Sequence, residues 1–167
     1  MVFRVAGGVA SGGAFVSGGY GMFASTANQT NPVASTANPV TLDTQIDGSS
    51  GVTNNNGLLT FTTAGSWQII FELAWTSTVG ANPVISQWLV KNGSNLANTG
   101  QDFQLLGGAN TVQMSACTFL VSVVTNDTLQ VYWSSSDTRV SLSYQGALST
   151  PTRPASPSAL VFVNRVG

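Results

Sequence analysis

The chain has 167 residues, of which only 7% are charged, and its formal net charge is −1. This length suits one domain with a sizeable core, and so neutral a surface is typical of a protein that stays packed against others. The five Lys and Arg residues are scattered, which argues against nucleic acid as a partner because no basic cluster can neutralise phosphates.

Residue types that often carry chemistry are scarce. The chain has no His, which excludes His-based triads, His metal sites and a histidine pH switch. Its single cysteine, Cys117, is predicted to be a small buried residue. A catalytic thiolate is the alternative, but it needs a positive neighbour and no His can supply one.

Residues 1–19 form a Gly-rich segment, with glycine pairs at 7–8, 12–13 and 18–19. The pairs interrupt its apolar character, so it does not match a signal peptide, and no apolar run approaches the length that spans a membrane. One interpretation is a flexible linker. The other is an extended attachment arm whose apolar side chains compensate for the entropy of ordering glycine. The predicted contact residues of this arm are Phe3, Arg4, Val5, Phe15 and Val16.

Strand patterns begin near Tyr20. A first strand over 20–25 is followed by a loop in which Ala-Ser-Thr-Ala-Asn occurs twice, at 24–28 and 34–38. Next come a strand "VTLDTQI", a turn-rich "DGSSGVTNNNG" and a strand "LLTFTT".

The segment 61–77, "FTTAGSWQIIFELAWTS", predicts a long strand because its residues alternate in character. One parity is entirely apolar and predicts a core face: Trp67, Ile69, Phe71, Leu73 and Trp75. The other parity is mixed: Gln68, Ile70, Glu72, Ala74 and Thr76. This second face is too apolar for ordinary exposure and too polar for a core, which predicts contact with another sheet or another subunit.

The remaining chain continues strand after strand. "VISQWLVKNGSNLAN" contains Asn92-Gly93, a strong hairpin signal, and "TVQMSACTFLVSVV" joins "DTLQVYWSSS" through a turn around Asn126. "RVSLSYQGAL" and "SALVFVNRV" flank a Pro-rich loop, "STPTRPASP". No segment has convincing helical periodicity. Eight to ten strands predict an all-β, two-sheet antiparallel sandwich or jelly roll.

The order of these motifs resembles the C1q/TNF-like domain over residues 20–167. The similar elements are the aromatic first strand "YGMF", "FTTAGSWQIIFELAW", the hairpin "WLVKNGS", the strand–turn–strand "VSVVTNDTLQVYW" and the last strand "ALVFVNRV". Where the family usually has Gly before Asp127, this chain has Asn126, which tolerates a turn backbone. The collagen-like stalk and signal peptide of secreted animal members have no counterpart here.

The resemblance implies a ten-strand jelly roll over 20–167, preceded by the arm 1–19, and a homotrimer in which the sheet with the long central strand faces the threefold axis. Trp75, Trp133 and Phe162 fit either an intrachain core or an interface. The interface residues that follow as a hypothesis are Tyr20, Phe23, Ile70, Glu72, Trp75, Tyr132, Trp133 and Phe162.

The acidic residues do not predict an enzyme. Asp127 and Asp47 are explained by turns, and Asp43 fits a strand surface. A carboxylate pair for glycoside cleavage, or a calcium site at Asp43 and Asp47, is possible in principle, but the spacing matches no known loop. We therefore expect no catalytic residue, no metal and no cofactor.

The expected role is a virion structural protein, because C1q/TNF-like trimers occur in phage and virus particles and the composition resembles theirs. The favoured function is a homotrimeric capsid decoration or cement protein, bound to the major capsid or another shell protein on the virion surface and assembled in host cytoplasm. Neither nucleic acid nor membrane is an expected partner. A receptor- or glycan-binding fibre tip is the alternative, although no stalk-like heptads precede the domain. A non-viral surface-layer or spore-coat protein is a weaker one.

Overall fold

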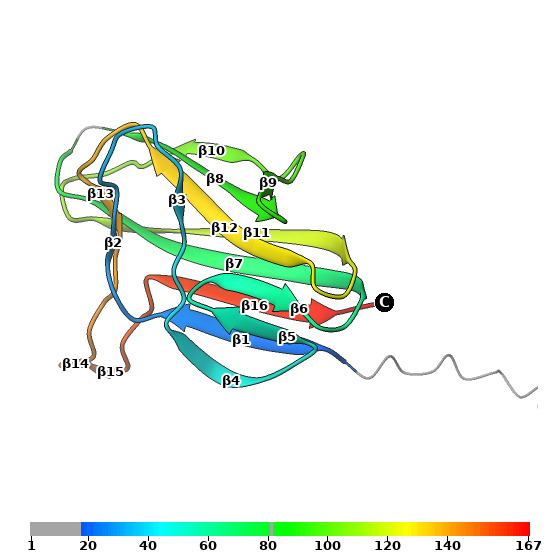
Figure 1. Ribbon diagram of the computed structural model, residues 1–167. Coiled ribbons are helices and arrows are strands. Elements are labelled where there is room, and N and C mark those ends of the chain that lie inside the picture. The colour runs from blue at the N-terminus through cyan, green and yellow to red at the C-terminus, as the bar shows by residue number, and fades with distance from the viewer. Residues whose placement is uncertain (1–17, 81) are drawn as a thin grey trace, which may run out of the picture.

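The computed structural model describes residues 18–80 and 82–167, and within them the chain folds as two large antiparallel sheets and one two-stranded sheet, β14-β15, without a helix (Figure 1). The strands are β1 (Tyr20–Ser25), β2 (Gln29–Thr30), β3 (Asn38–Pro39), β4 (Thr44–Ser50), β5 (Val52–Asn55), β6 (Leu58–Phe61), β7 (Gly65–Ser77), β8 (Val84–Lys91), β9 (Ser94–Asn95), β10 (Gln101–Gln104), β11 (Val112–Val123), β12 (Thr128–Ser135), β13 (Val140–Leu142), β14 (Leu148–Ser149), β15 (Thr152–Arg153) and β16 (Ala159–Arg165). The all-β prediction is confirmed.

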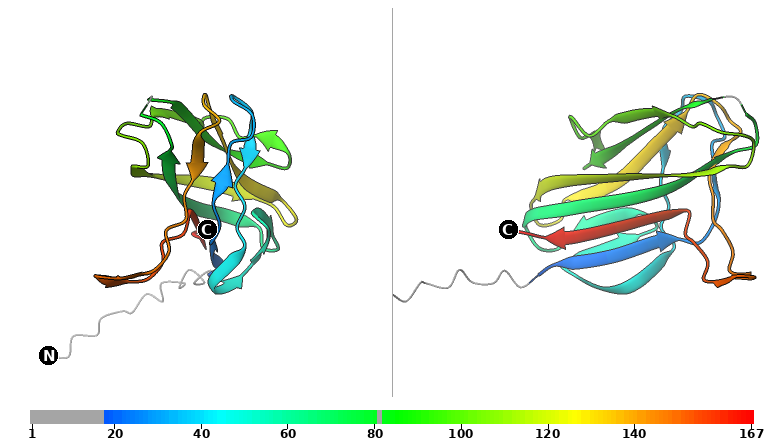
Figure 2. Two further views of the ribbon diagram at one scale, coloured as in Figure 1. Left: turned by 90° about the vertical axis from the view of Figure 1, so that its left-hand side faces the viewer. Right: turned by 180° about the vertical axis from the view of Figure 1, so that it is seen from behind.

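The two sheets have the crossed strand order of a jelly roll. In the first, which we call the β7 sheet, β7 pairs with β11 on one side and with β16 and β13 on the other. β1 and β4 continue beyond β16, and β2 continues beyond β13. The second, the β12 sheet, has the order β10-β8-β12-β6-β5, with β3 on β12 and β9 on β8. Figure 2 (right) shows β11, β7, β16 and β1 side by side.

The core lies between the sheets, and β7 supplies its centre. The five residues of the predicted core face, Trp67 to Trp75 in steps of two, are all 0% exposed, so that prediction is confirmed. Burying side chains of this size stabilises the fold by about 1.5–3 kcal/mol each. Aromatic rings dominate the packing: Trp75 meets Trp133 edge-on with ring centroids 5.2 Å apart, and Phe61 meets Trp67 at 4.9 Å.

Two predicted turns adopt the backbone that their sequences require. Asn92 and Gly93 have φ of 50° and 76°, as a tight hairpin turn with two left-handed residues needs. Asn126 has φ of 70°, so it holds the left-handed turn expected before Asp127.

The sequence pattern misplaced the polar strands. The stretch predicted to be turn-rich, 47–57, contains the end of β4 and all of β5, while the predicted strand beginning at Val40 begins at Thr44. β10 and the two-residue strands β2, β3 and β15 were also missed. These strands border the sheets or are very short, so they lack the apolar alternation that marks a strand with one buried face.

A buried hydrogen-bond chain joins the two sheets around Cys117. Trp75 Nε1 donates to Ser115 Oγ at 2.7 Å, which donates to Gln87 Oε1 at 2.8 Å. Gln87 Nε2 lies 2.8 Å from Cys117 Sγ, which lies 2.9 Å from Gln101 Oε1. Cys117 is buried as predicted, and burial raises the pKa of its thiol even though the bond from Gln87 opposes this. Its role is therefore structural.

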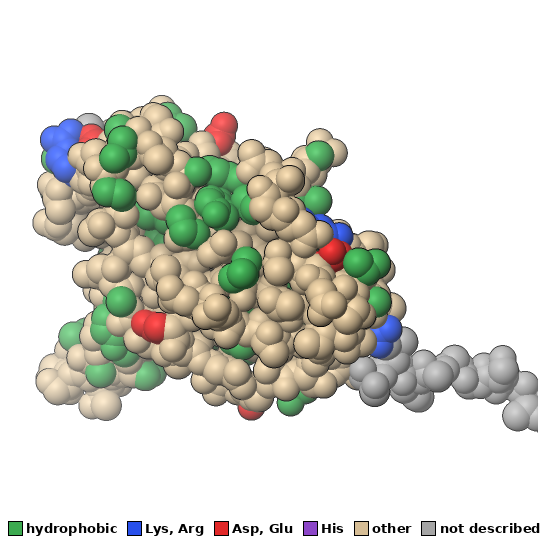
Figure 3. All heavy atoms as spheres, in the orientation of Figure 1, with side chains coloured by type: hydrophobic (Ala, Val, Ile, Leu, Met, Phe, Trp, Pro, Cys, Tyr) green, Lys and Arg blue, Asp and Glu red, His purple; other side chains and the backbone are tan. Residues whose placement is uncertain are grey.

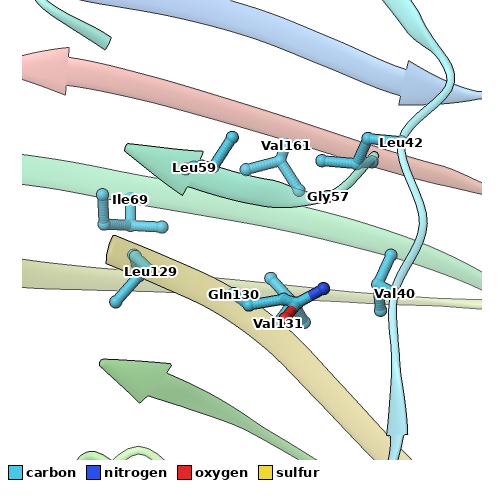
Figure 4. Close-up of a pocket in the computed structure, with 9 residues that line it drawn as sticks. All are labelled: Val40, Leu42, Gly57, Leu59, Ile69, Leu129, Gln130, Val131 and Val161. Carbon is cyan, nitrogen blue, oxygen red and sulfur yellow. The ribbon is translucent and has the colours of Figure 1, made fainter. Parts of the chain in front are cut away.

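The apolar gap between β6 and β12 is part of this core. Figure 4 shows side chains from both sheets pointing into it, including Leu59, Ile69, Leu129 and Val161. The gap leaves no room for a water molecule. The two sheets pack closely here, and no ligand can enter the gap.

Candidate subunit interface

The outward face of the β7 sheet carries many apolar side chains. Its strands lie in the order β1, β16, β7, β11, and their pairing places outward side chains in rows across the sheet. The rows are Tyr20–Asn164–Gln68–Leu120, Met22–Phe162–Ile70–Thr118 and Ala24–Leu160–Glu72–Ala116, followed by the pair Ala74–Met114.

The middle of this face is apolar where an antiparallel sheet facing water is usually polar. Met22, Phe162 and Ile70 form a continuous half-buried row. On β11, two apolar side chains are largely exposed to solvent: Leu120 is 69% exposed and Met114 is 62% exposed. Half-buried and exposed apolar side chains gathered on one sheet face favour an interaction site.

Glu72 is the one Asp, Glu, Lys or Arg side chain among these rows. It is half-buried and lies between Leu160 and Ala116. The two ion pairs of the described chain are Lys91–Asp127 and Arg139–Asp137, so neither involves Glu72. A half-buried carboxylate between apolar side chains is unfavourable unless it accepts hydrogen bonds. An interface in which another chain supplies a donor to Glu72 would meet this need.

β11 also presents a free backbone edge. The carbonyl of Ser122 accepts a hydrogen bond from Lys91 Nζ at 2.7 Å, so it points away from β7. The register between β11 and β7 is unbroken, so the backbone groups of Met114, Ala116, Thr118 and Leu120 point the same way. The edge is flanked by hollows of about 320 Å³ and 460 Å³, both lined by Phe119 and Leu120.

The structure separates the predicted interface residues into three groups. Tyr20, Ile70, Glu72 and Phe162 lie together on the outward face of the β7 sheet. Phe23, Trp75 and Trp133 are each 0% exposed in the core, so their inclusion as interface residues was wrong. Their strand parity points them between the sheets, where they contact other core residues.

Tyr132 lies on the opposite side of the molecule from this face. It points outward from the β12 sheet, with its ring centroid 6.1 Å from that of Trp88. Figure 3 shows the β12-sheet side of the molecule, where hydrophobic side chains gather over the region of β8 and β12. Tyr132 therefore cannot share one flat interface with Ile70 and Phe162.

Sequence reasoning missed several residues of the candidate face, chiefly Met22, Leu160, Met114 and Leu120. Both parities of β11 carry apolar residues, so its alternation does not say which parity faces out. The strand pairing shows which parity of β11 faces outward. Leu120 lies beside Gln68 and Thr118 beside Ile70, and both partners point outward from β7.

The predicted arm residues Phe3, Arg4, Val5, Phe15 and Val16 lie outside the described residues. Its predicted last residue, Gly19, is buried, and its carbonyl accepts a hydrogen bond from the Arg165 N–H at 2.7 Å. A Cβ at this position would come within 2.3 Å of the Trp67 ring. Gly19 therefore packs as part of the jelly roll.

Four of the six acidic side chains, those of Asp43, Asp47, Asp127 and Asp137, are held by structural partners. Asp43 accepts hydrogen bonds from Thr26 N, Thr26 Oγ1 and Thr44 Oγ1, at 3.0, 3.1 and 2.9 Å. Burial opposes these bonds, which together leave the pKa of Asp43 below its ordinary value. Asp47 Oδ1 accepts a hydrogen bond from the N–H of Gly48 at 2.8 Å. Within 18–80 and 82–167, no three His, Cys, Asp or Glu residues gather as metal ligands would.

Asp127 fixes the turn between β11 and β12. Its carboxylate accepts from Asn92 Nδ2 at 2.7 Å and from the Val124 N–H at 2.8 Å, and pairs with Lys91 at 2.8 Å. The bond from Asn92, then those from Lys91 and Val124, lower the pKa of Asp127 to about 2. The group is thus part of the fold, and a proton acceptor for catalysis would need a higher pKa.

The described part of the chain contains no helix long and apolar enough to cross a membrane. No protein-family model matches the sequence. No curated protein is similar to it at a significant level.

Solved structures do resemble this one. The crystal structure of murine APRIL superposes with a TM-score of 0.57 at 9% identity, covering 89% of this chain and 99% of that chain. The globular domain of zebrafish complement 1qA protein superposes with a TM-score of 0.51 at 10% identity, covering 90% and 96%. The crossed strand order agrees with both likenesses, so the chain has the C1q/TNF-like jelly-roll fold.

Proposed function

We propose that the chain is a non-enzymatic structural protein that forms a homotrimer through the outward face of the β7 sheet. The observation that carries this proposal is the apolar face itself, with its row Met22–Phe162–Ile70 and the exposed Leu120 and Met114 at the β11 border. Burying such a surface is the main driving force of stable association.

Two different patches on the surface favour a closed ring over a two-fold dimer, and the C1q/TNF-like fold supports a ring of three. A closed ring joins copies head to tail, so each chain must offer two different patches. Here the sheet face around Ile70 is one patch, and the free edge of β11, flanked by its two hollows, is the other. The β11 edge of one copy then packs against the sheet face of the next.

A structural role also agrees with the chemistry of the described residues. Cys117 is buried, and burial raises the pKa of its thiol, which leaves little thiolate for catalysis. Asp43, Asp127 and Asp137 are each saturated by backbone or side-chain donors. We therefore propose that the protein acts by binding and covering a surface.

The particular surface that we propose is the outside of a virus or phage capsid. The partner is the major capsid protein or another shell protein, and the location is the virion, assembled in host cytoplasm. The low charge of the chain supports this, since decoration proteins lie packed against a shell. The Gly-rich segment with Phe3, Val5, Phe15 and Val16 is the proposed attachment device.

Sedimentation with capsids tests this role. The full chain and a variant lacking residues 1–17, which keeps the packed Gly19, are mixed with particles from the source virus and centrifuged. We expect the full chain to sediment with the particles and the truncated chain to stay in solution while keeping its mass as an oligomer. Absence of the full chain from purified particles would contradict the capsid role. Equal binding by the two forms would contradict the attachment role of the N-terminal segment.

A receptor- or glycan-binding tip is the second candidate function. A polar hollow between β2 and β3 is the specific observation that favours it. A ligand bound in this hollow would make the trimer a recognition module.

A further inference from the structure

A polar hollow of about 320 Å³ lies where β2 of the β7 sheet and β3 of the β12 sheet approach each other. Of the eight residues that line it, five are Asn, Gln or Thr, two are Pro, and the last is Trp133. None of them is charged. Such a lining does not suit phosphate, carboxylate or a metal ion, each of which needs opposite charge.

The floor of the hollow is rigid. Gln29 on β2 pairs with the backbone of Thr41 as a strand would: Thr41 N donates to Gln29 Oε1 at 2.8 Å, and Gln29 Nε2 donates to the Thr41 carbonyl at 3.1 Å. Asn38 donates to Asn31 Oδ1 at 2.9 Å. These bonds tie the two sheets together, so the hollow exists before any ligand arrives.

Several polar groups around the hollow have no partner within the described chain. The hydroxyls of Thr30 and Thr41, Asn28 Nδ2 and Asn38 Oδ1 make no hydrogen bond there, although Asn28 Oδ1 does accept from the Tyr144 N–H. Trp133 is completely buried, yet its Nε1 also has no partner within 18–80 and 82–167. A buried donor without an acceptor is unfavourable.

We propose that this hollow binds a neutral sugar unit of a glycan. A sugar offers hydroxyls that can both donate and accept, which matches the free amide and hydroxyl groups of Asn28, Thr30, Asn38 and Thr41. Its C–H faces pack on apolar side chains, which the hollow supplies through Pro32 and Pro39. Trp133 lines the hollow but is completely buried, so it does not touch the sugar, and its indole N–H serves as a reporter of changes in the hollow.

The neighbouring surface suits a second sugar unit. Pro39, on the rim of the hollow, lies opposite Tyr132 on β12, and Tyr132 lies opposite Trp88 on β8. The two rings are tilted by 31° and are both half-exposed on the outward face of the β12 sheet. A glycan leaving the hollow over Pro39 meets this pair of rings. The inference rests on the hollow alone and does not depend on the proposed capsid role.

The test uses the indole N–H signals of the four tryptophans in the full-length protein. Each signal is assigned by a Trp→Phe variant, and glucose, galactose, mannose and N-acetylglucosamine are added one at a time. We expect at least one sugar to move the Trp133 signal to saturation. The Trp67 signal is the internal reference, because Trp67 Nε1 already donates to the Thr63 carbonyl at 3.2 Å.

Two variants make the test specific to the hollow. The double variant Thr30→Val and Thr41→Val removes two free hydroxyls while keeping side-chain shape, so sugar affinity falls by roughly tenfold or more. Thr30→Val alone, at an exposed position, supplies a milder form of the same test. Thr53→Val, on exposed β5, leaves affinity unchanged. The proposal is overturned if no sugar moves the Trp133 signal, or if the threonine variants bind as tightly as the parent.

Discussion

Phe162 on β16 lies directly opposite Ile70 on β7, and both side chains point out of the sandwich. Met22 on β1 extends the same row on the far side of Phe162. Three neighbouring strands thus place apolar side chains in line on a surface that faces solvent in the single chain. The proposed trimer follows from this relationship.

A charge at the border of this face should prevent assembly without unfolding the chain. Leu120 is 69% exposed, so Leu120→Glu removes little packing within one copy, but in the trimer it buries an unpaired carboxylate. We expect a folded monomer by analytical ultracentrifugation and far-UV circular dichroism. Val33→Glu, at a loop residue that is 57% exposed, is the matched control and should leave the oligomer intact. If Leu120→Glu still forms a trimer, the interface does not include the β11 border of this face.

Trp75 should be essential to the core of each copy. Trp75→Ala leaves a large cavity beside Trp133 and frees the Ser115 hydroxyl, so we expect a loss of about 3–5 kcal/mol in the free energy of unfolding. Urea unfolding at one fixed protein concentration measures it. Trp88→Ala, at a half-exposed ring, should cost clearly less. Equal losses at the two positions would mean that Trp75 is not central to the core.

Asp127 should make stability depend on acid pH. Its pKa is about 2 in the folded chain against an ordinary 3.8, so its stabilising contribution is complete above pH 3.8 and disappears as the pH falls towards 2. Asp127→Asn should lower the melting temperature at neutral pH and flatten its decline between pH 4 and pH 2. Asp102→Asn, at an exposed carboxylate on β10, is the control. An unchanged acid profile in Asp127→Asn would contradict the role of the turn.

Removing metal ions should not alter stability. The carboxylate of Asp43 is already engaged by Thr26 and Thr44, and that of Asp47 by the N–H of Gly48. Dialysis against a chelator should therefore leave the melting temperature unmoved. A fall of several degrees, restored by calcium, would identify a site that these side chains form after all.

The sequence predicts the long strands well because one face of each is strongly apolar. The alternation from Trp67 to Trp75 defines β7, and Asn92-Gly93 defines the hairpin after β8. β5 could not be found in this way, since "VTNN" at the border of its sheet shows no apolar repeat. Short polar strands form because a neighbouring strand offers hydrogen bonds, and that neighbour is known only once the fold is known.

The candidate face could be predicted only in part. Ile70 and Glu72 follow from the mixed parity of β7, but Trp75 and Trp133 could equally have been core or interface. Their burial depends on which strand of the other sheet lies above them, and a single sequence does not say so. The hollow beside Trp133 has the same origin, because Thr30, Asn38 and Thr41 come together only when the two sheets pack.

The mass of the full-length protein in solution tests the central claim most directly. Sedimentation equilibrium at micromolar concentration should return three times the chain mass of 17.2 kDa, because the apolar face around Ile70 and Phe162 is buried between copies. A species of 17.2 kDa that persists as the concentration is raised would contradict the proposed trimer.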